Sequence, residues 1–179
     1  MNASGLNDLC GELLDACVRA LDTIPAQVPG LEGAPLLRYV SPGEPAADCP
    51  PQLTVHVSSL DEASTEPGGL GAGRRASYGR INHATLIATL FRCVPTGSET
   101  KTKYVPPDAI SLEQAAKQIN ADGWALWNHL YNEIRAGLLF SLCQGVFWMG
   151  MRSLPPQGGA AGLVLALRIA LDGYEETLP

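Results

Sequence analysis

The feature that most constrains the fold is the run of residues 79–95, in which neither Gly nor Pro occurs between Arg80 and Val94. Ile, Leu, Thr and Phe dominate this run, which is typical of a β-strand that Pro95 ends. The even positions of residues 84–90 make a small, smooth apolar face, and the odd positions make a second face that is half apolar. A strand with two usable faces is normally central in its sheet, so we expect this strand to be central.

The length of this run has a consequence for the whole chain. At about 3.3 Å per residue it would extend roughly 40 Å, whereas an ordinary strand extends about 20 Å. The chain has only 179 residues, which fits one domain better than two. A strand that outruns the core of a small domain needs cover from elsewhere, and we expect another subunit to supply it.

Two amphipathic helices are predicted from apolar residues that recur at three- and four-residue spacings. The first covers residues 6–21 and is closed by Pro25. The second begins at Ser111, which forms a capping box with Gln114, and Gly137 is its expected stop. Each helix has one apolar stripe that must pack on something, and the sheet is the candidate.

Alternating apolar and polar residues predict the other strands. Residues 52–59 are typical of a half-exposed strand, and residues 36–40 of a short edge strand within a Pro-rich segment. Residues 146–153 and 163–171 form a predicted hairpin around a turn at 154–159.

The element order predicts an α+β fold, with one mainly antiparallel sheet of four to five strands and two helices packed on one face. The 19 Gly and 14 Pro cluster between the periodic segments. We therefore expect a single domain over residues 1–179, with long loops at 25–51, 60–78 and 96–110.

The charge balance limits the class of partner. A net charge of −6 argues against a protein that binds nucleic acid through its surface. The same charge suits a protein past which DNA slides without specific binding. The N-terminus lacks the pattern of a secretory signal, and no apolar run reaches the roughly 18 residues of a membrane span. We expect no membrane association and folding in a cytosol.

Residues able to support chemistry are scattered. The three histidines lie on three different elements without metal-ligand spacing, so no metal site is expected. His56 and His83 would be cross-strand neighbours if the strand register allowed it, and they are the one hint of a ligand pocket. The Gly-rich run 68–73 lacks the flanking strand and helix of a phosphate loop. We expect no catalytic residue and no cofactor.

The cysteines number five, an odd count without CxxC spacing. We interpret them as reduced thiols that pack as small apolar groups, and we include Cys93, although Arg92 beside it would favour a reactive thiolate.

Six aromatic residues are concentrated in the last third of the chain, and their helical and strand spacing favours a place in the core. They are Trp124, Trp127, Tyr131, Phe140, Phe147 and Trp148.

The one basic cluster consists of Arg74, Arg75 and Arg80, with Tyr78 among them. Arg and Tyr are both favoured at protein interfaces, so we hypothesise a loop that docks on a partner. A solvated loop without a partner is the alternative, and the sequence leaves both open.

The arrangement of elements resembles the tail terminator (tail-completion) proteins of long-tailed bacteriophages, such as the one from phage lambda. The resemblance begins with the helix at 6–21 and the strand Pro51-Gln-Leu-Thr-Val-His-Val-Ser. It continues through an acidic-to-Gly loop, the long strand ending Leu-Phe-Arg-Cys-Val-Pro, the helix from Ser111 and the closing hairpin. The segment Arg92-Cys93-Val94-Pro95-Thr96 is similar to segments of neck-region proteins of phages of high-GC actinobacteria. The resemblance covers most of the chain, but not the Pro-rich segment 25–50.

This resemblance implies a structural protein of the virion, assembled in the host cytoplasm, whose homo-hexameric ring caps the finished tail tube. Such a ring ends tube polymerisation, contacts the tail tube protein and the head–tail stopper or connector protein, and lets DNA pass through its lumen. The family's functional residues are not fixed by a motif, so none is carried over. Two alternatives stay open: another neck protein, such as a stopper or adaptor, and a small cytosolic ligand-binding α+β domain.

Overall fold

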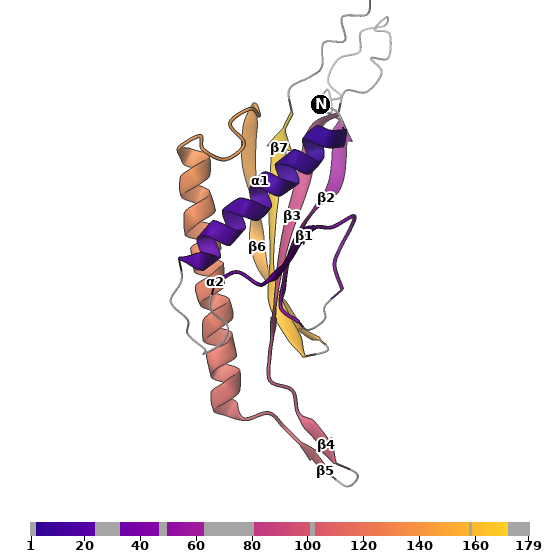
Figure 1. Ribbon diagram of the computed structural model, residues 1–179, viewed down its shortest axis with the longest axis vertical. Helices are drawn as coiled ribbons and strands as arrows, with labels where there is room; N and C mark the ends of the chain where they lie inside the picture. Colours follow the sequence, from indigo (N-terminus) through magenta and orange to yellow (C-terminus); the bar gives the residue numbers. More distant parts are fainter. Residues whose placement is uncertain are drawn as a thin grey trace, which may run out of the picture.

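The computed structural model describes residues 3–23, 33–46, 50–62, 81–100, 103–157 and 159–171. Within these residues, two helices pack on a five-stranded sheet, and a small two-stranded hairpin lies apart from it (Figure 1). The elements in chain order are α1 (Ala3–Asp22), β1 (Leu37–Val40), β2 (Gln52–Glu62), β3 (Ile81–Cys93), β4 (Ser98–Thr100), β5 (Lys103–Val105), α2 (Ala109–Arg135), β6 (Gly145–Gln157) and β7 (Ala160–Ala170).

The main sheet has the strand order β1-β2-β3-β7-β6. All neighbouring pairs are antiparallel except β1 and β2, which are parallel. The predicted α+β class with a mainly antiparallel sheet is confirmed, and so is the central place of the long strand, now β3. β2 and β7 of the same chain pair with β3 along its length. The backbone cover that we expected from another subunit is therefore supplied within the chain.

One face of the sheet forms the core under both helices (Figure 1). The even positions of β3 from Ala84 to Leu90 are buried there, beside the odd positions of β7. The stripe of α1 is buried as predicted, with Leu13, Cys17 and Leu21 wholly inaccessible. Because side chains alternate along a strand, this face takes every second residue of β3 and leaves the others on the far face.

On the far face of the sheet, the side chains of β2 are less exposed than predicted. Thr54 and His56 are buried together with the apolar residues of this strand, so the prediction of a half-exposed strand is wrong. The reason is the segment that connects β1 to β2: the Gln52 side chain donates a hydrogen bond to the Ala46 carbonyl at 2.6 Å, and the charge of Glu44 acts on His56. A crossover between parallel strands passes over one face of the sheet and covers it.

The start of α2 differs from the prediction, whereas its end agrees with it. The helix begins two residues earlier than expected because Asp108 is its N-cap, and the Asp108 carboxylate accepts the Ser111 N–H at 3.0 Å. The predicted capping box at Ser111 is therefore wrong. Gly137 follows the helix with a φ of 68°, and this left-handed conformation, which favours glycine, ends α2 as predicted.

Two other boundaries differ from the prediction. The segment 96–110 was expected to be a loop, but it contains the hairpin of β4 and β5. The predicted turn at 154–159 is shorter, because β6 continues to Gln157 and β7 begins at Ala160. Both differences arise because strands of three residues, or strands that contain Pro at a sheet edge, have no period that a sequence pattern can reveal.

A buried ion pair fastens α2 to the sheet. Arg92 of β3 donates to both carboxylate oxygens of Asp122, at 2.8 and 3.1 Å, and neither side chain is more than 3% exposed. Gln118 donates to the same carboxylate at 2.9 Å, and Arg92 also donates to the Gly33 carbonyl at 2.6 Å. Burial raises the pKa of the Asp122 carboxyl, and the hydrogen bonds from Arg92 and Gln118 oppose this rise.

Candidate functional site

The predicted docking residues Arg74, Arg75, Tyr78 and Arg80 lie outside the residues that the structure describes. The docking-loop hypothesis therefore stays a prediction.

The two histidines that hinted at a ligand pocket are not neighbours. His56 lies opposite Ile87, and His83 lies opposite Asp61, so the strand register does not make the two histidines cross-strand neighbours. The register aligns Leu53 with Leu90 and Val55 with Ala88, which places these apolar residues together on the core face. Burial of that face sets the register and separates the histidines. Among the described residues, no three His, Cys, Asp or Glu side chains gather as metal ligands.

The cysteines divide into two kinds. Cys10 and Cys17 are buried free thiols on α1, as predicted, and burial raises their pKa values to about 11 and about 12. Cys93 is disulfide-bonded, so the interpretation of it as a reduced apolar group is wrong. Spacing along the chain does not show which cysteines the fold brings together, so it could not reveal that Cys93 forms a disulfide.

Most of the aromatic residues that we placed in the core lie at the surface. Phe140 is buried, but Trp124 is 70% exposed and Phe147 is 55% exposed. Trp124, Trp127 and Tyr131 lie on α2, whereas Phe147 pairs opposite Arg168 and lies on the far face of the sheet, and the described part of the chain covers neither group. We call five exposed apolar residues around the end of the sheet the α2–β6 margin: Trp124, Trp127, Tyr131, Phe147 and Met149.

Two aromatic side chains of this margin, Trp127 and Tyr131, are held by ring contacts. Trp127 meets Trp148 of β6 edge to face, with ring centroids 4.5 Å apart, and stacks on Tyr131 at 5.9 Å. The Arg135 guanidinium lies 5.7 Å from the Tyr131 ring centroid, which is within reach of a cation–π interaction. Side chains fixed in this way lose little conformational entropy when a partner binds, so they make a preorganised contact surface.

A groove of about 450 Å³ runs between α2 and β6 on the helix side of the sheet. Gly123 lines it and allows α2 to lie close to the sheet, since an added Cβ there would lie 3.2 Å from Leu163 and 3.3 Å from Met151. The lining is mainly apolar and consists of Ile119, Asn120, Gly123, Trp124, Trp127, Met151, Ser153 and Leu163.

β6 borders this groove, and among the described residues it is an edge strand whose one neighbour in the sheet is β7. Its pairing with β7 is regular over residues 145–148 and again over 150–154, with Met149 as the extra residue between them. Arg152 is its one charged residue, and Pro155 and Pro156 lie near its end. Natural edge strands are usually protected by charge, Pro or bulges. Here the bulge and the prolines flank residues 150–154, and Arg152 is the one charged residue within this stretch.

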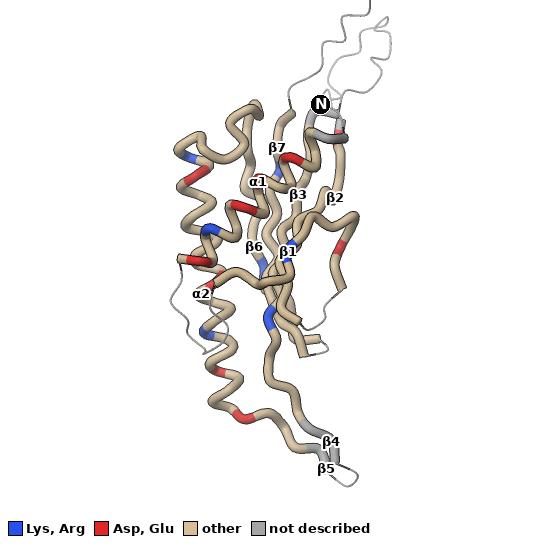
Figure 2. Tube along the Cα trace, viewed as in Figure 1, with Lys and Arg blue, Asp and Glu red and all other residues tan. Residues whose placement is uncertain are grey.

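The opposite edge of the sheet is β1. All four residues of β1 are exposed, and Leu36 just before it is fully exposed. In the described part of the chain no strand pairs with the outer side of β1. Figure 2 shows acidic residues distributed along both helices and few charged residues on the sheet strands. In the part of the chain that the structure describes, the sheet therefore presents two different open edges that are mainly apolar.

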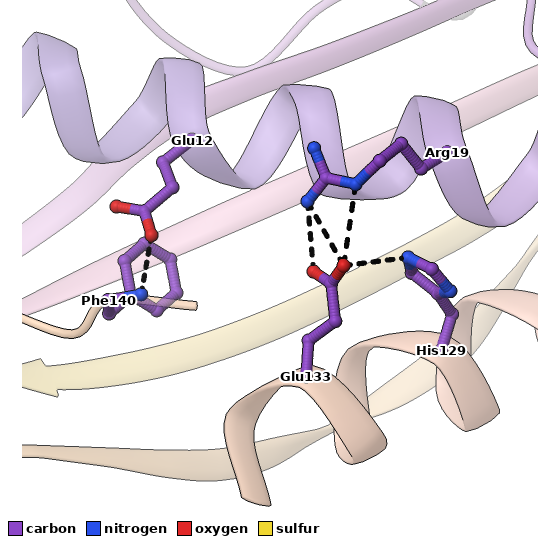
Figure 3. A network of polar contacts seen from close by, with 5 residues as sticks. All are labelled: Glu12, Arg19, His129, Glu133 and Phe140. Atoms are coloured by element: carbon purple, nitrogen blue, oxygen red, sulfur yellow. Dashed lines mark hydrogen bonds and ion pairs between the residues drawn. The ribbon is translucent and has the colours of Figure 1, made fainter. Parts of the chain in front are cut away.

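A second, wider groove of about 640 Å³ lies beside α2 near the end of α1. Two of its polar residues, His129 and Glu133, already form ion pairs within the chain (Figure 3). Glu133 accepts from Arg19 at 3.0 Å and lies 3.1 Å from His129. Asn132, another lining residue, donates to Asn128 at 3.4 Å.

The same region holds the chain after α2 (Figure 3). The Glu12 carboxylate accepts the Phe140 N–H at 2.6 Å, and Phe140 has a left-handed φ of 58°. We interpret this whole network as the connection between α1, α2 and the loop that follows, not as a ligand site.

No protein-family model matches the sequence, and no curated protein matches it at a significant level. Neither described helix combines the length and the apolar character needed to cross a membrane.

Proposed function

We propose that this chain is a tail terminator protein of a long-tailed phage. In this proposal its copies form a ring, hexameric by resemblance to that family, that caps the tail tube, ends tube polymerisation and joins the tail to the head-side connector. The observation that supports it best is the pair of open apolar edges, β1 and β6, at opposite sides of one sheet.

Two different edges favour a ring over a symmetric dimer. A contact between unlike surfaces of identical subunits is heterologous, and it builds a ring where the rotation closes and an open filament where it does not. The α2–β6 margin adds large apolar side chains to one of these edges, and exposed apolar patches of this kind mark protein–protein contacts. The proposed role is thus one of surface geometry and requires no catalytic group.

The hairpin of β4 and β5 supports contact with other tail components. It projects away from the body along the long axis of the molecule, beyond the end of the main sheet (Figure 1). Val105, Ile110 and Leu112, between the hairpin and the first turn of α2, are exposed. If the ring axis runs along the strands, this hairpin points along the axis, towards the tube or the connector.

The charge fits the same proposal. A net charge of −6 disfavours binding of DNA to the walls of a lumen through which it must pass. The loop with Arg74, Arg75, Tyr78 and Arg80 stays a hypothetical docking element for the tube or connector protein.

The test is polymerisation of the tail tube protein encoded by the same phage, followed by electron microscopy of tube lengths. With this chain present, we expect tubes to stop growing and to carry a ring at one end. The Phe147→Lys variant, checked for folding by circular dichroism, should stop growth less well. Tubes that grow to the same lengths with and without the chain would contradict the proposal. Rings that bind only the head-side connector would favour the stopper or adaptor alternative.

A further inference from the structure

We propose that β1 of one copy binds along β6 of the next copy, beside the groove between α2 and β6, and extends its sheet by one antiparallel strand. This inference rests on the proposed ring, and it names the contact that builds it. The partner is therefore a second copy of this chain, and the contact surfaces are the two open edges described above.

The pairing register supports this match, because it places both edges at the same height, by which we mean the position along the strand direction. The steps across the sheet can be followed from one strand to the next. Residues 37–40 pair with 52–55, these with 91–88, these with 162–165, and these with 154–151. A rotation about an axis parallel to the strands keeps every residue at its height. In such a ring, β1 of the next copy arrives opposite residues 151–154 of β6.

The strand directions also agree. β1 runs parallel to β2 and therefore opposite to β3, whereas β6 runs in the same direction as β3. Rotation about the strand axis preserves these directions, so β1 of one copy and β6 of the next are antiparallel. The regularly paired stretch 150–154 lies between two register shifts and is long enough for the four residues of β1.

The side chains of β1 suit the two faces that they would meet. Val40 lies on the same face as Val55, which is the helix side, and it would enter the groove beside Met151 and Trp124. Leu37 and Tyr39 lie on the other face, where they would meet Arg152 and Leu154 of β6. Strand addition of this kind combines backbone hydrogen bonds with pockets for alternate side chains.

A two-fold pairing explains the surfaces less well. Two β6 edges joined by a two-fold axis would make a closed dimer and leave the exposed residues of β1 unused. A contact between β1 and β6 uses both open edges in every copy.

The test is a disulfide cross-link between copies. Arg38 and Ser153 are both exposed and stand at the same height on the helix side, so their side chains would be opposite each other across the contact. We would prepare the variants Arg38→Cys and Ser153→Cys, mix them under mild oxidation, and separate the products on a non-reducing gel. The unsubstituted chain in the same gel is the control for native cysteines. Each variant is first checked for ring formation with tube protein by light scattering.

We expect a cross-linked dimer only in the mixture, and a ladder up to the full ring when both substitutions are in one chain. Rings that form without this cross-link would overturn the inference and leave the terminator proposal intact. Self-cross-linking of either single variant would also overturn it, because it would indicate a two-fold contact. Failure of the unsubstituted chain to form any ring with tube protein would overturn both.

Discussion

The guanidinium of Arg92 and the carboxylate of Asp122 meet at 2.8 Å in the interior, although 30 residues separate them in the chain. This pair joins the end of β3 to the middle of α2, and Gly123 next to Asp122 allows the helix to lie close to the sheet. The position of α2, and therefore of the groove beside β6, depends on this pair.

Removal of one partner should be costly. Asp122→Asn leaves the buried Arg92 charge without its counter-ion, and such losses destabilise proteins by about 3–5 kcal/mol. We expect the free energy of unfolding, measured with urea, to fall by this amount. The double variant Arg92→Leu with Asp122→Leu should recover part of it, since no uncompensated charge remains. The exposed pair of Glu113 and Lys117 provides the control, and Glu113→Gln should leave the unfolding midpoint unchanged. Equal effects of Asp122→Asn and Glu113→Gln would contradict the account.

His56 should make stability depend on pH. Burial lowers its pKa below the ordinary value of 6.5, an effect that the charge of Glu44 partly opposes, and its Nδ1 has no hydrogen-bond partner in the described structure. Between the lowered folded pKa and 6.5 the unfolded chain binds more protons than the folded chain. The contribution of His56 is therefore fully present above pH 6.5 and is lost as the pH falls through this window.

The measurement is the free energy of unfolding at a series of pH values for the natural chain and for His56→Gln. The difference between the two should shrink as the pH falls below 6.5. A difference that stays constant with pH would show that His56 has the same pKa in both states.

Gly162 should tolerate no side chain. A Cβ at this position would overlap the Leu90 carbonyl oxygen of the neighbouring strand, so β3 and β7 would have to separate. We expect Gly162→Ala to destabilise the protein by about 3 kcal/mol, the upper end of overpacking costs. Gly11, within α1, has no atom within 4 Å of such a Cβ. Gly11→Ala should stabilise by about 0.5–1 kcal/mol through helix propensity. Thermal unfolding of both variants checks the pair, and a stable Gly162→Ala variant would show that the two strands are less close.

Cys10 and Cys17 should react only when the protein opens. Burial raises their pKa values to about 11 and about 12, so thiolate is scarce at pH 8 and reagent has no access. We expect both to resist alkylation in the native protein and to react quickly in urea, as read by mass spectrometry of peptides. Rapid native labelling would place α1 away from the sheet.

The sequence predicted the central architecture because its signals there are local and long. The run from Arg80 to Val94 has no interruption, and the stripe of α1 repeats over several turns. The hairpin of β4 and β5 was missed because three-residue strands show no period. The Arg92–Asp122 pair was missed because no local pattern connects residues of different elements.

The candidate site was harder to predict for a different reason. Helical spacing shows that Trp124, Trp127 and Tyr131 lie near one another on α2, but it does not show whether this chain covers them. In the structure it does not, and the residues we assigned to the core form part of the α2–β6 margin. The same spacing would appear in a core and in an interface, because both bury apolar side chains.

The most direct test of the central claim, that this chain assembles into a ring, is its mass in solution by light scattering, alone and with tail tube protein. We expect a species near six times 18.9 kDa, either for the chain alone or after tube protein is added. A particle that stays at 18.9 kDa under both conditions would contradict the account and favour a small ligand-binding domain.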